Sequence, residues 1–192
     1  MRKKMTEIFT KGSFDGFKNI DLKMARSSIN ESLIGRKIPV FISHKHEDLD
    51  DLKGIIGFLE VCFNVKAYID SRDPSMPKIT SGETAKIIKN RIKNCKKFIL
   101  LATDAAIESK WCNWELGFGD AAKLKENVVL FPMKKRGIEY KGNEYMEIYS
   151  YISYYEEGDK YSSGKNIVPG YYVTTRTKTG KYIIPLREWL ER

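Results

Sequence analysis

Residues 38–70 have the sequence IPVFISHKHEDLDDLKGIIGFLEVCFNVKAYID, and this stretch decides the fold. Its apolar runs at 38–43 and 65–70 have the length and composition of buried strands. Between them, apolar residues recur with helical period, and carboxylates gather at the start, where a helix dipole favours negative charge. The stretch therefore predicts a helix from about 47 to 63 between two strands.

The same alternation continues downstream. Apolar runs at 98–103 (FILLAT) and 127–133 (NVVLFPM) predict two more strands. Helical periodicity predicts a helix from about 81 to 95, opened by the capping-box sequence TSGE at 80–83, and another from about 109 to 124. Because strand and helix alternate, right-handed crossovers build an open parallel sheet with helices on both faces. We expect an α/β fold with a flavodoxin-like, doubly wound parallel sheet.

The two ends of the chain predict elaborations of this core. A loose helical repeat of apolar residues before the first strand predicts a helical extension over residues 1–36. The α/β domain is expected over 37–155, with a fifth strand IYSYISYY at 148–155. In the last part, 156–192, two short strands flank a turn at 176–180. This part predicts a hairpin and a closing helix packed on the same domain.

The charge of the chain is consistent with several kinds of partner. Its 192 residues include 34 Lys and Arg against 25 Asp and Glu, a formal net charge of +9. Such an excess attracts polyanions, so nucleic acid and the phosphates of a dinucleotide are both candidate partners, and a solvated basic face is the third reading. Nucleic acid is disfavoured, because no recognised nucleic-acid-binding motif accompanies the charge.

Several absences indicate a cytoplasmic protein without a membrane partner. No run approaches the roughly 20 apolar residues of a membrane helix, and the basic start of the chain is not followed by an apolar stretch. The cysteines Cys62, Cys95 and Cys112 are odd in number and widely spaced. This usage predicts free thiols in a reducing cytoplasm rather than a disulfide framework.

The loop after the first strand has the position of a ligand-binding loop, because ligands of such sheets bind outside the carboxyl ends of the strands. It places a hydroxyl, Ser43, and an imidazole, His44, before the amides of the next helix, where a phosphate binds well. The alternative is that Ser43 only ends the strand and the following residues form a solvated helix entry. His44 and His46 also suggest a metal site, but they are the only histidines and no C-x-x-C accompanies them, so we expect no metal.

The helix from about 109 begins with SKWCNWELG, in which Trp111 and Glu115 share one face that continues into Phe118 and Ala122. A carboxylate in line with an apolar row is out of place on a solvated surface. Burial would raise its pKa and mark it as a functional candidate. The alternative is that Glu115 lies at the edge of the stripe and pairs with a lysine.

Four motifs together resemble the TIR domain family. FISHKHED is similar to the first strand of TIR domains, AYID and the long loop to SGET to the second strand and BB loop, FILLAT to the third strand, and SKWCNWEL to the W-x-x-x-E helix. The match covers about 38–133. This chain has SGE where the BB loop often has PGE or PGD, and its loop is several residues longer.

The resemblance implies an activity and its residues. Many bacterial and plant TIR domains cleave NAD at the nicotinamide–ribose bond with the glutamate of W-x-x-x-E, giving ADP-ribose or cyclic forms, whereas others are non-catalytic adaptors. By this resemblance Glu115 is the catalytic carboxylate, and Ser43, His44, Trp111 and Asp70 bind the substrate. NAD is then a substrate, and no cofactor is expected.

The resemblance also implies partners. TIR domains that cleave NAD complete their sites from a neighbouring copy through the BB loop, which implies self-association through residues 70–82. The chain is also similar to the signal-making TIR subunit of the Thoeris anti-phage defence system, which implies a downstream effector that senses the nucleotide product.

Overall fold

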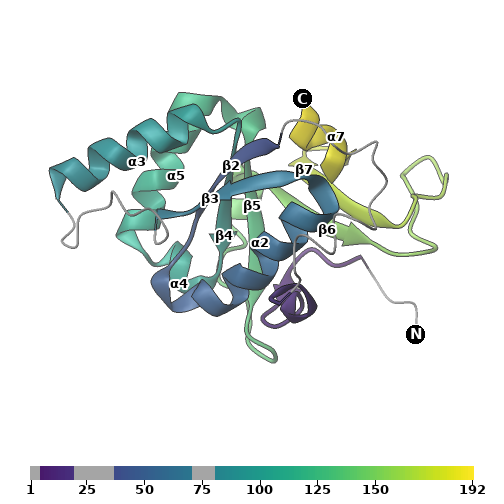
Figure 1. Cartoon of the computed structure of the whole chain (residues 1–192). Helices are drawn as coiled ribbons and strands as arrows, with labels where there is room; N and C mark the ends of the chain where they lie inside the picture. Colours follow the sequence, from purple (N-terminus) through teal and green to yellow (C-terminus); the bar gives the residue numbers. More distant parts are fainter. Residues whose placement is uncertain (1–4, 20–36, 71–80) are drawn as a thin grey trace.

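A computed structural model describes residues 5–19, 37–70 and 81–192 of the chain. Its sheet has the strand order β3-β2-β4-β5-β6-β7-β8, with β1 paired to β5 beside this path. The pairs from β3 to β6 are parallel, and β7 and β8 add an antiparallel hairpin at one edge. Figure 1 shows this sheet with the hairpin at one side of the molecule. The strands are β1 Phe9–Thr10, β2 Ile38–Ser43, β3 Val65–Tyr68, β4 Lys97–Ala102, β5 Val128–Lys134, β6 Ser150–Tyr155, β7 Gly170–Thr177 and β8 Gly180–Pro185.

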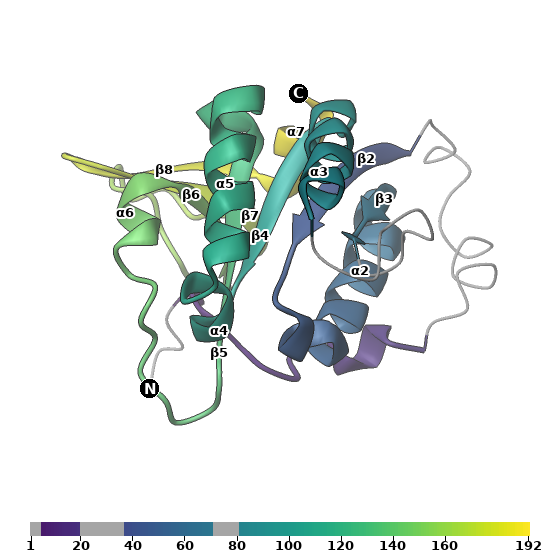
Figure 2. The same ribbon diagram turned by 90° about the vertical axis from the view of Figure 1, so that its left-hand side faces the viewer.

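Helices cover both faces of the sheet, as the alternation predicts. Figure 2 shows α2 and α5 on opposite sides of the strands. The α-helices are α2 Leu49–Phe63, α3 Gly82–Asn94, α4 Asp104–Ile107, α5 Lys110–Lys123, α6 Tyr145–Ile148 and α7 Leu186–Glu191. The 3₁₀ helices are η1 Asp15–Phe17, η3 His46–Asp48 and η5 Lys125–Asn127. The predicted doubly wound α/β fold is confirmed.

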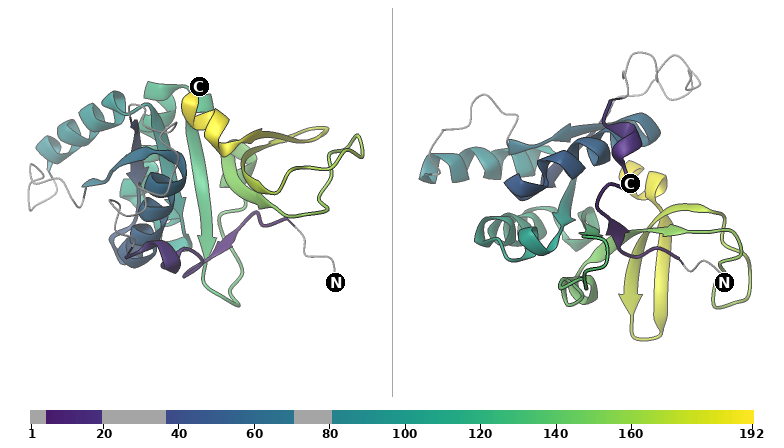
Figure 3. Two further views of the ribbon diagram at one scale, coloured as in Figure 1. Left: turned by 45° about the vertical axis from the view of Figure 1, so that its right-hand side comes forward. Right: turned by 90° about the horizontal axis from the view of Figure 1, so that it is seen from below.

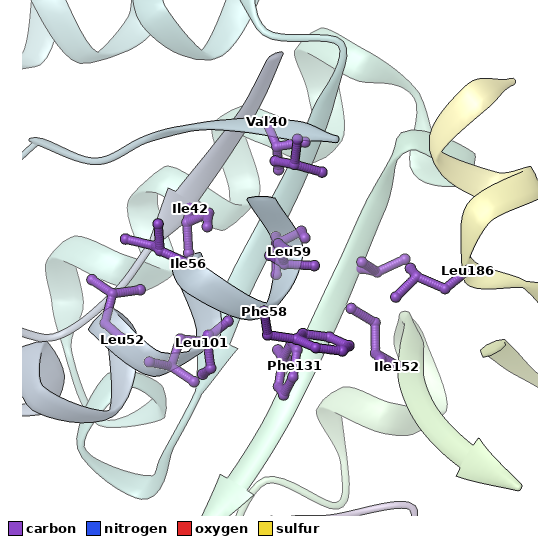
Figure 4. Packing of buried hydrophobic residues seen from close by; sticks show 14 of the residues in the cluster. Val40, Ile42, Leu52, Ile56, Phe58, Leu59, Leu101, Phe131, Ile152 and Leu186 are labelled. Atoms are coloured by element: carbon purple, nitrogen blue, oxygen red, sulfur yellow. The ribbon is translucent and has the colours of Figure 1, made fainter. Parts of the chain in front are cut away.

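Two hydrophobic clusters, one on each face, explain the continuous apolar runs of the central strands. In β4, Ile99 and Leu101 lie in the cluster under α2 and α7, whereas Phe98 and Leu100 lie in the cluster under α3 and α5. Every residue of β4 is buried. A strand that is covered on both faces has no solvent-facing side, so its sequence does not alternate between apolar and polar residues. Figure 4 shows the first cluster, in which side chains of α2 meet those of the strands and Leu186 of α7.

The capping box of α3 lies one residue later than predicted. Ser81 is the N-cap, its Oγ accepts from the Thr84 amide, and Thr84 Oγ1 accepts from the Ser81 amide. A threonine hydroxyl therefore takes the role that the sequence assigns to Glu83, which is exposed. The predicted partner Thr80 lies outside the described residues.

The N-terminal segment differs from the predicted helical extension where the structure describes it. Within residues 5–19 the regular elements are β1 and η1, not an α-helix. Phe14 and Phe17 have helical spacing, but they pack on α2 from a single 3₁₀ turn. The rest of the predicted extension, 1–4 and 20–36, lies outside the described residues.

The C-terminal segments extend the same sheet. β6 pairs with β5, the hairpin of β7 and β8 follows, and α7 packs into the cluster under α2. The strand at the end of 37–155, the hairpin and the closing helix form as predicted, while the domain boundaries themselves stay predictions. No helix in the described ranges is long and apolar enough to cross a membrane.

Candidate active site

The strand order places the candidate site at the carboxyl ends of β2 and β4. From β2 the chain first adds β3 on one side and then β4 on the other, so the two crossovers diverge at this point. Ser43 is the last residue of β2, and Thr103 directly follows β4. Ligands of open α/β sheets bind at such a switch point.

Glu115 lies at this point and is buried. Only 2% of its surface is exposed, and Ser43 Oγ donates to its Oε2 at 2.5 Å. Ser109 caps the start of α5 by accepting from the Cys112 amide, which fixes the turn before Glu115. The structure therefore brings together Ser43 and Glu115, which lie far apart in the sequence, and places Glu115 in the site rather than at a solvated helix edge.

The surroundings of Glu115 favour the neutral form of its carboxyl group. Burial raises its pKa from 4.5 to about 8, against a hydrogen bond from Ser43 that lowers it. The charge of Asp70 raises the pKa further, and a hydrogen bond from the Trp111 side chain lowers it. A positive charge that developed beside Glu115 would favour the ionised carboxylate, because it would stabilise the negative charge and so lower the pKa.

His44 and Asp70 form the second half of the site. His44 Nδ1 lies 3.7 Å from Asp70 Oδ1 and 3.4 Å from the carbonyl oxygen of Ile42. Burial lowers the pKa of His44 below its usual value, and the nearby Asp70 carboxylate opposes this effect. The imidazole is therefore neutral at neutral pH. The Asp70 charge acts on both His44 and Glu115. The Ser43–Glu115 pair and the His44–Asp70 pair therefore share one electrostatic environment.

A third cluster at this edge is centred on Asp48, for which the sequence analysis predicts no role in the site. Asp48 is 1% exposed, and its Oδ2 accepts from Thr103 Oγ1 at 2.5 Å. Its Oδ1 accepts from Lys11 Nζ. The position of Thr103 after a buried strand is a signal that sequence analysis could have used. Lys11 gave no such signal, since nothing near it in the sequence points to Asp48.

The basic residues of α3 pack on the aromatic residues of α5. Lys89 Nζ lies 5.7 Å from the ring centre of Trp114 and 5.5 Å from that of Phe118, and Lys93 Nζ lies 5.9 Å from Phe118. Trp114 in turn lies 4.8 Å from Trp111. Cation–π contacts of this kind give Lys89 and Lys93 a packing role that needs no anionic partner.

Among the residues that the structure describes, no three His, Cys, Asp or Glu side chains are grouped so that they could hold a metal ion. Cys62, Cys95 and Cys112 are free thiols, and burial raises the pKa of each. The side chains gathered at this edge of the sheet include the carboxyl groups of Glu115, Asp70 and Asp48, the hydroxyl groups of Ser43 and Thr103, the imidazole of His44 and the indole of Trp111.

Comparison with known proteins identifies relatives. The sequence profile of the TIR domain family matches residues 40–163. The chain is 29% identical over 118 residues to "Probable 3' cyclic ADP-D-ribose synthase ThsB'" of Bacillus cereus (strain MSX-D12), covering 59% of this chain and 60% of the relative. It is 27% identical over 117 residues to "Putative cyclic ADP-D-ribose synthase TIR2" of Cytobacillus dafuensis, covering 53% of this chain and 31% of the relative. The chain thus matches three fifths of the first relative and about a third of the second.

A solved structure is also similar. It is the crystal structure of the TIR domain of the Toll-related receptor TRR-2 from Hydra magnipapillata, with 18% sequence identity and a TM-score of 0.41. The similarity covers 54% of this chain and 77% of that one.

Proposed function

This chain belongs to the TIR domain family, and we propose that it cleaves NAD at the bond between nicotinamide and ribose, with Glu115 as the catalytic carboxylate. The observation that carries the proposal is the buried Glu115, held by Ser43 at the switch point of the sheet. A buried acid with a pKa of about 8 is a typical sign of a catalytic carboxyl group. The two relatives, both named as cyclic ADP-D-ribose synthases, support the same chemistry.

The reaction develops positive charge on the ribose, which the Glu115 carboxylate can stabilise. As the bond from ribose C1″ to the nicotinamide nitrogen breaks, its electron pair leaves with nicotinamide and C1″ becomes an oxocarbenium ion, as in glycoside hydrolysis. The Glu115 carboxylate stabilises this ion, and its hydrogen bonds from Ser43 and Trp111 fix its orientation. Binding of the cationic nicotinamide ring already favours ionisation of Glu115.

A nucleophile completes the reaction. Either water or another hydroxyl group of the same molecule attacks C1″, forms a C–O bond and loses its proton. Attack by water gives ADP-ribose, and attack by the hydroxyl group gives a cyclic ADP-ribose. Glu115 can accept this proton, because its pKa lies close to the pH of the reaction. The names of the relatives favour the cyclic product. His44 and Asp70 line the same edge and bind the rest of the substrate.

Partners and location follow from the same proposal. We infer that the protein acts in the cytoplasm in anti-phage defence, and that its product activates a separate effector. Self-association through residues 70–82 would complete the site. Residues 71–80 of that loop lie outside the described residues, so this part rests on the resemblance of the sequence alone.

One experiment separates catalysis from the main alternative, a non-catalytic TIR interaction module. Purified protein is incubated with NAD, alone and with a crowding agent, and nicotinamide and the nucleotide products are separated by chromatography and identified by mass spectrometry. Release of nicotinamide that is lost in Glu115→Gln supports the proposed enzyme. No release under any condition, from a folded protein, favours the interaction module.

A further inference from the structure

Residues 5–18, here called the N-terminal strap, run along the carboxyl-terminal edge of the sheet (Figure 3). Thr6 pairs with Tyr154 of β6, and β1 pairs with the last residues of β5. The strap then continues through η1, which lies against α2. It precedes the residues that match the TIR domain family, which begin at 40. The candidate site lies at the same edge of the sheet.

Two glycines of α2 form the surface on which the strap lies. A Cβ atom at Gly54 would lie 2.5 Å from the carbonyl oxygen of Phe14, and one at Gly57 would lie 2.2 Å from that of Phe17. Only glycine lets two backbones approach this closely. The Phe14 ring is buried, with its centre 4.9 Å from that of Phe58. The strap therefore packs closely against α2 and is part of the fold.

Lys11 connects the strap to the site through Asp48. Its Nζ donates to Asp48 Oδ1 and lies 3.5 Å from Asp51 Oδ2. Burial disfavours the charged ammonium, but the hydrogen bond and charge of Asp48 outweigh it and raise the pKa of Lys11. Lys11 thus compensates a buried carboxylate, which otherwise carries a large desolvation penalty.

Asp48 in turn holds the two loops of the switch point together. It ends the loop that follows Ser43, the last residue of β2, and it accepts from Thr103, which begins the loop after β4. Thr103 Oγ1 also accepts from the Ala106 amide and so caps α4. A displaced Asp48 would therefore release both loops.

We propose that Lys11 is a positioning residue of the active site, which acts through Asp48 to fix the loop 44–48 and so to hold the end of β2, with Ser43, against Glu115. The N-terminal strap, outside the family match, is then a component of the active centre. This inference rests on the proposed cleavage of NAD by Glu115, so its test includes a measurement that does not depend on turnover.

The test compares variants of the full chain. Lys11→Met removes the ammonium and keeps most of the chain length, whereas Lys11→Arg keeps a charged donor. Lys18→Met is the matched control, because Lys18 also lies in the strap but pairs at 2.7 Å and 2.6 Å with Asp15 and Asp50, two exposed carboxylates.

The expected result has three parts. In Lys11→Met the kcat for nicotinamide release falls by more than about tenfold while KM stays within about threefold, because positioning of bound substrate is lost rather than binding. Lys11→Arg returns kcat to within about threefold, and Lys18→Met stays within about twofold of the parent. Hydrogen exchange at the amides of 44–48 and 103–107 becomes faster in Lys11→Met and not in Lys18→Met.

A double-mutant cycle tests the route through Asp48. If the two residues act as a unit, Lys11→Met has no further effect on kcat in an Asp48→Asn background. Additive losses would overturn the proposal, as would a Lys11→Met protein with parental kcat or with unchanged exchange in both loops.

Two further outcomes are separable. If Lys11→Met does not fold, Asp48→Asn takes its place, and a kcat within about twofold of the parent then refutes the positioning role. If the parent protein itself releases no nicotinamide, the proposed function is wrong, while the exchange of the two loops still decides whether Lys11 fixes them.

Discussion

Glu115→Gln is the substitution for which the structure makes the sharpest prediction, because activity and stability should change in opposite directions. Glutamine has nearly the shape of glutamate and can still accept the hydrogen bond that Ser43 donates at 2.5 Å. What it lacks is the ability to become negative. The fold is therefore expected to remain intact while the charge required by the transition state is lost.

The effect on stability follows from the pKa of Glu115. The folded protein holds the proton up to a pKa of about 8, whereas the unfolded chain releases it near 4.5. Between these values the unfolded state binds fewer protons, so the stability of the parent falls as pH rises. From about pH 5 to about pH 8 the loss is roughly 4 kcal/mol, at 1.36 kcal/mol per pH unit. Glu115→Gln has no such proton to lose.

The assay is thermal or denaturant unfolding of both proteins across this range. The two should be similar near pH 5, and the glutamine variant should become more stable as pH rises, by roughly 10 °C in Tm near pH 8 for a chain of this size. Glu157→Gln, which changes an exposed carboxyl, is the control and should leave the pH dependence unaltered. Nicotinamide release, measured on the same samples, should fall below about a tenth of the parental rate.

Either half of the result can refute the reasoning. A parallel pH dependence of the two proteins would mean that Glu115 is ionised in the folded protein across this range and that its burial does not hold the proton. Nicotinamide release above about a tenth of the parental rate would exclude a catalytic carboxylate worth several kcal/mol.

Three other predictions concern the metal, the loop and the strap. NAD cleavage should survive exhaustive chelation, because the described residues offer no metal cluster; loss of turnover with a chelator and its return with zinc or manganese would contradict this. Cleavage per molecule should rise steeply with protein concentration, and Met76→Asp in the 70–82 loop should flatten the rise; a specific activity that does not change with concentration would contradict self-association. Gly57→Ala should destabilise the protein by about 1–3 kcal/mol in denaturant unfolding, because its Cβ would meet the strap backbone. Gly117→Ala, with nothing within 4 Å of its Cβ, should be neutral or stabilising.

The core of the fold could be predicted because its signals are local. Each central strand is one uninterrupted apolar run, and each helix carries its apolar stripe within a single segment. The open parallel sheet with helices on both faces then followed from the right-handed crossovers. Ser43 and Glu115 could each be singled out as candidates for the same reason, since one ends a strand and the other lies on the apolar face of a helix, whereas the hydrogen bond between them comes from the structure.

The cluster around Asp48 could not be predicted, because its energetics depend on partners distant in the sequence. Asp48 lies in an acidic run at the start of a helix, where a solvated carboxylate is the ordinary outcome. Its burial becomes tolerable only when Lys11 and Thr103 converge on it from two other segments. No periodicity or spacing within one segment indicates such a convergence.

The strap did leave a signal in the sequence, but in α2 rather than in the strap itself. A glycine inside a helix costs about 1 kcal/mol relative to alanine, so two of them, Gly54 and Gly57, require compensation. They are three residues apart and share a face, while the leucines and isoleucines of the same helix already face the sheet. A glycine pair on the second face of such a helix is therefore explained by a backbone that crosses it. Phe14 and Phe17, also three residues apart, are the matching pair on the crossing segment, and their spacing reflects the helix on which they lie rather than a helix of their own.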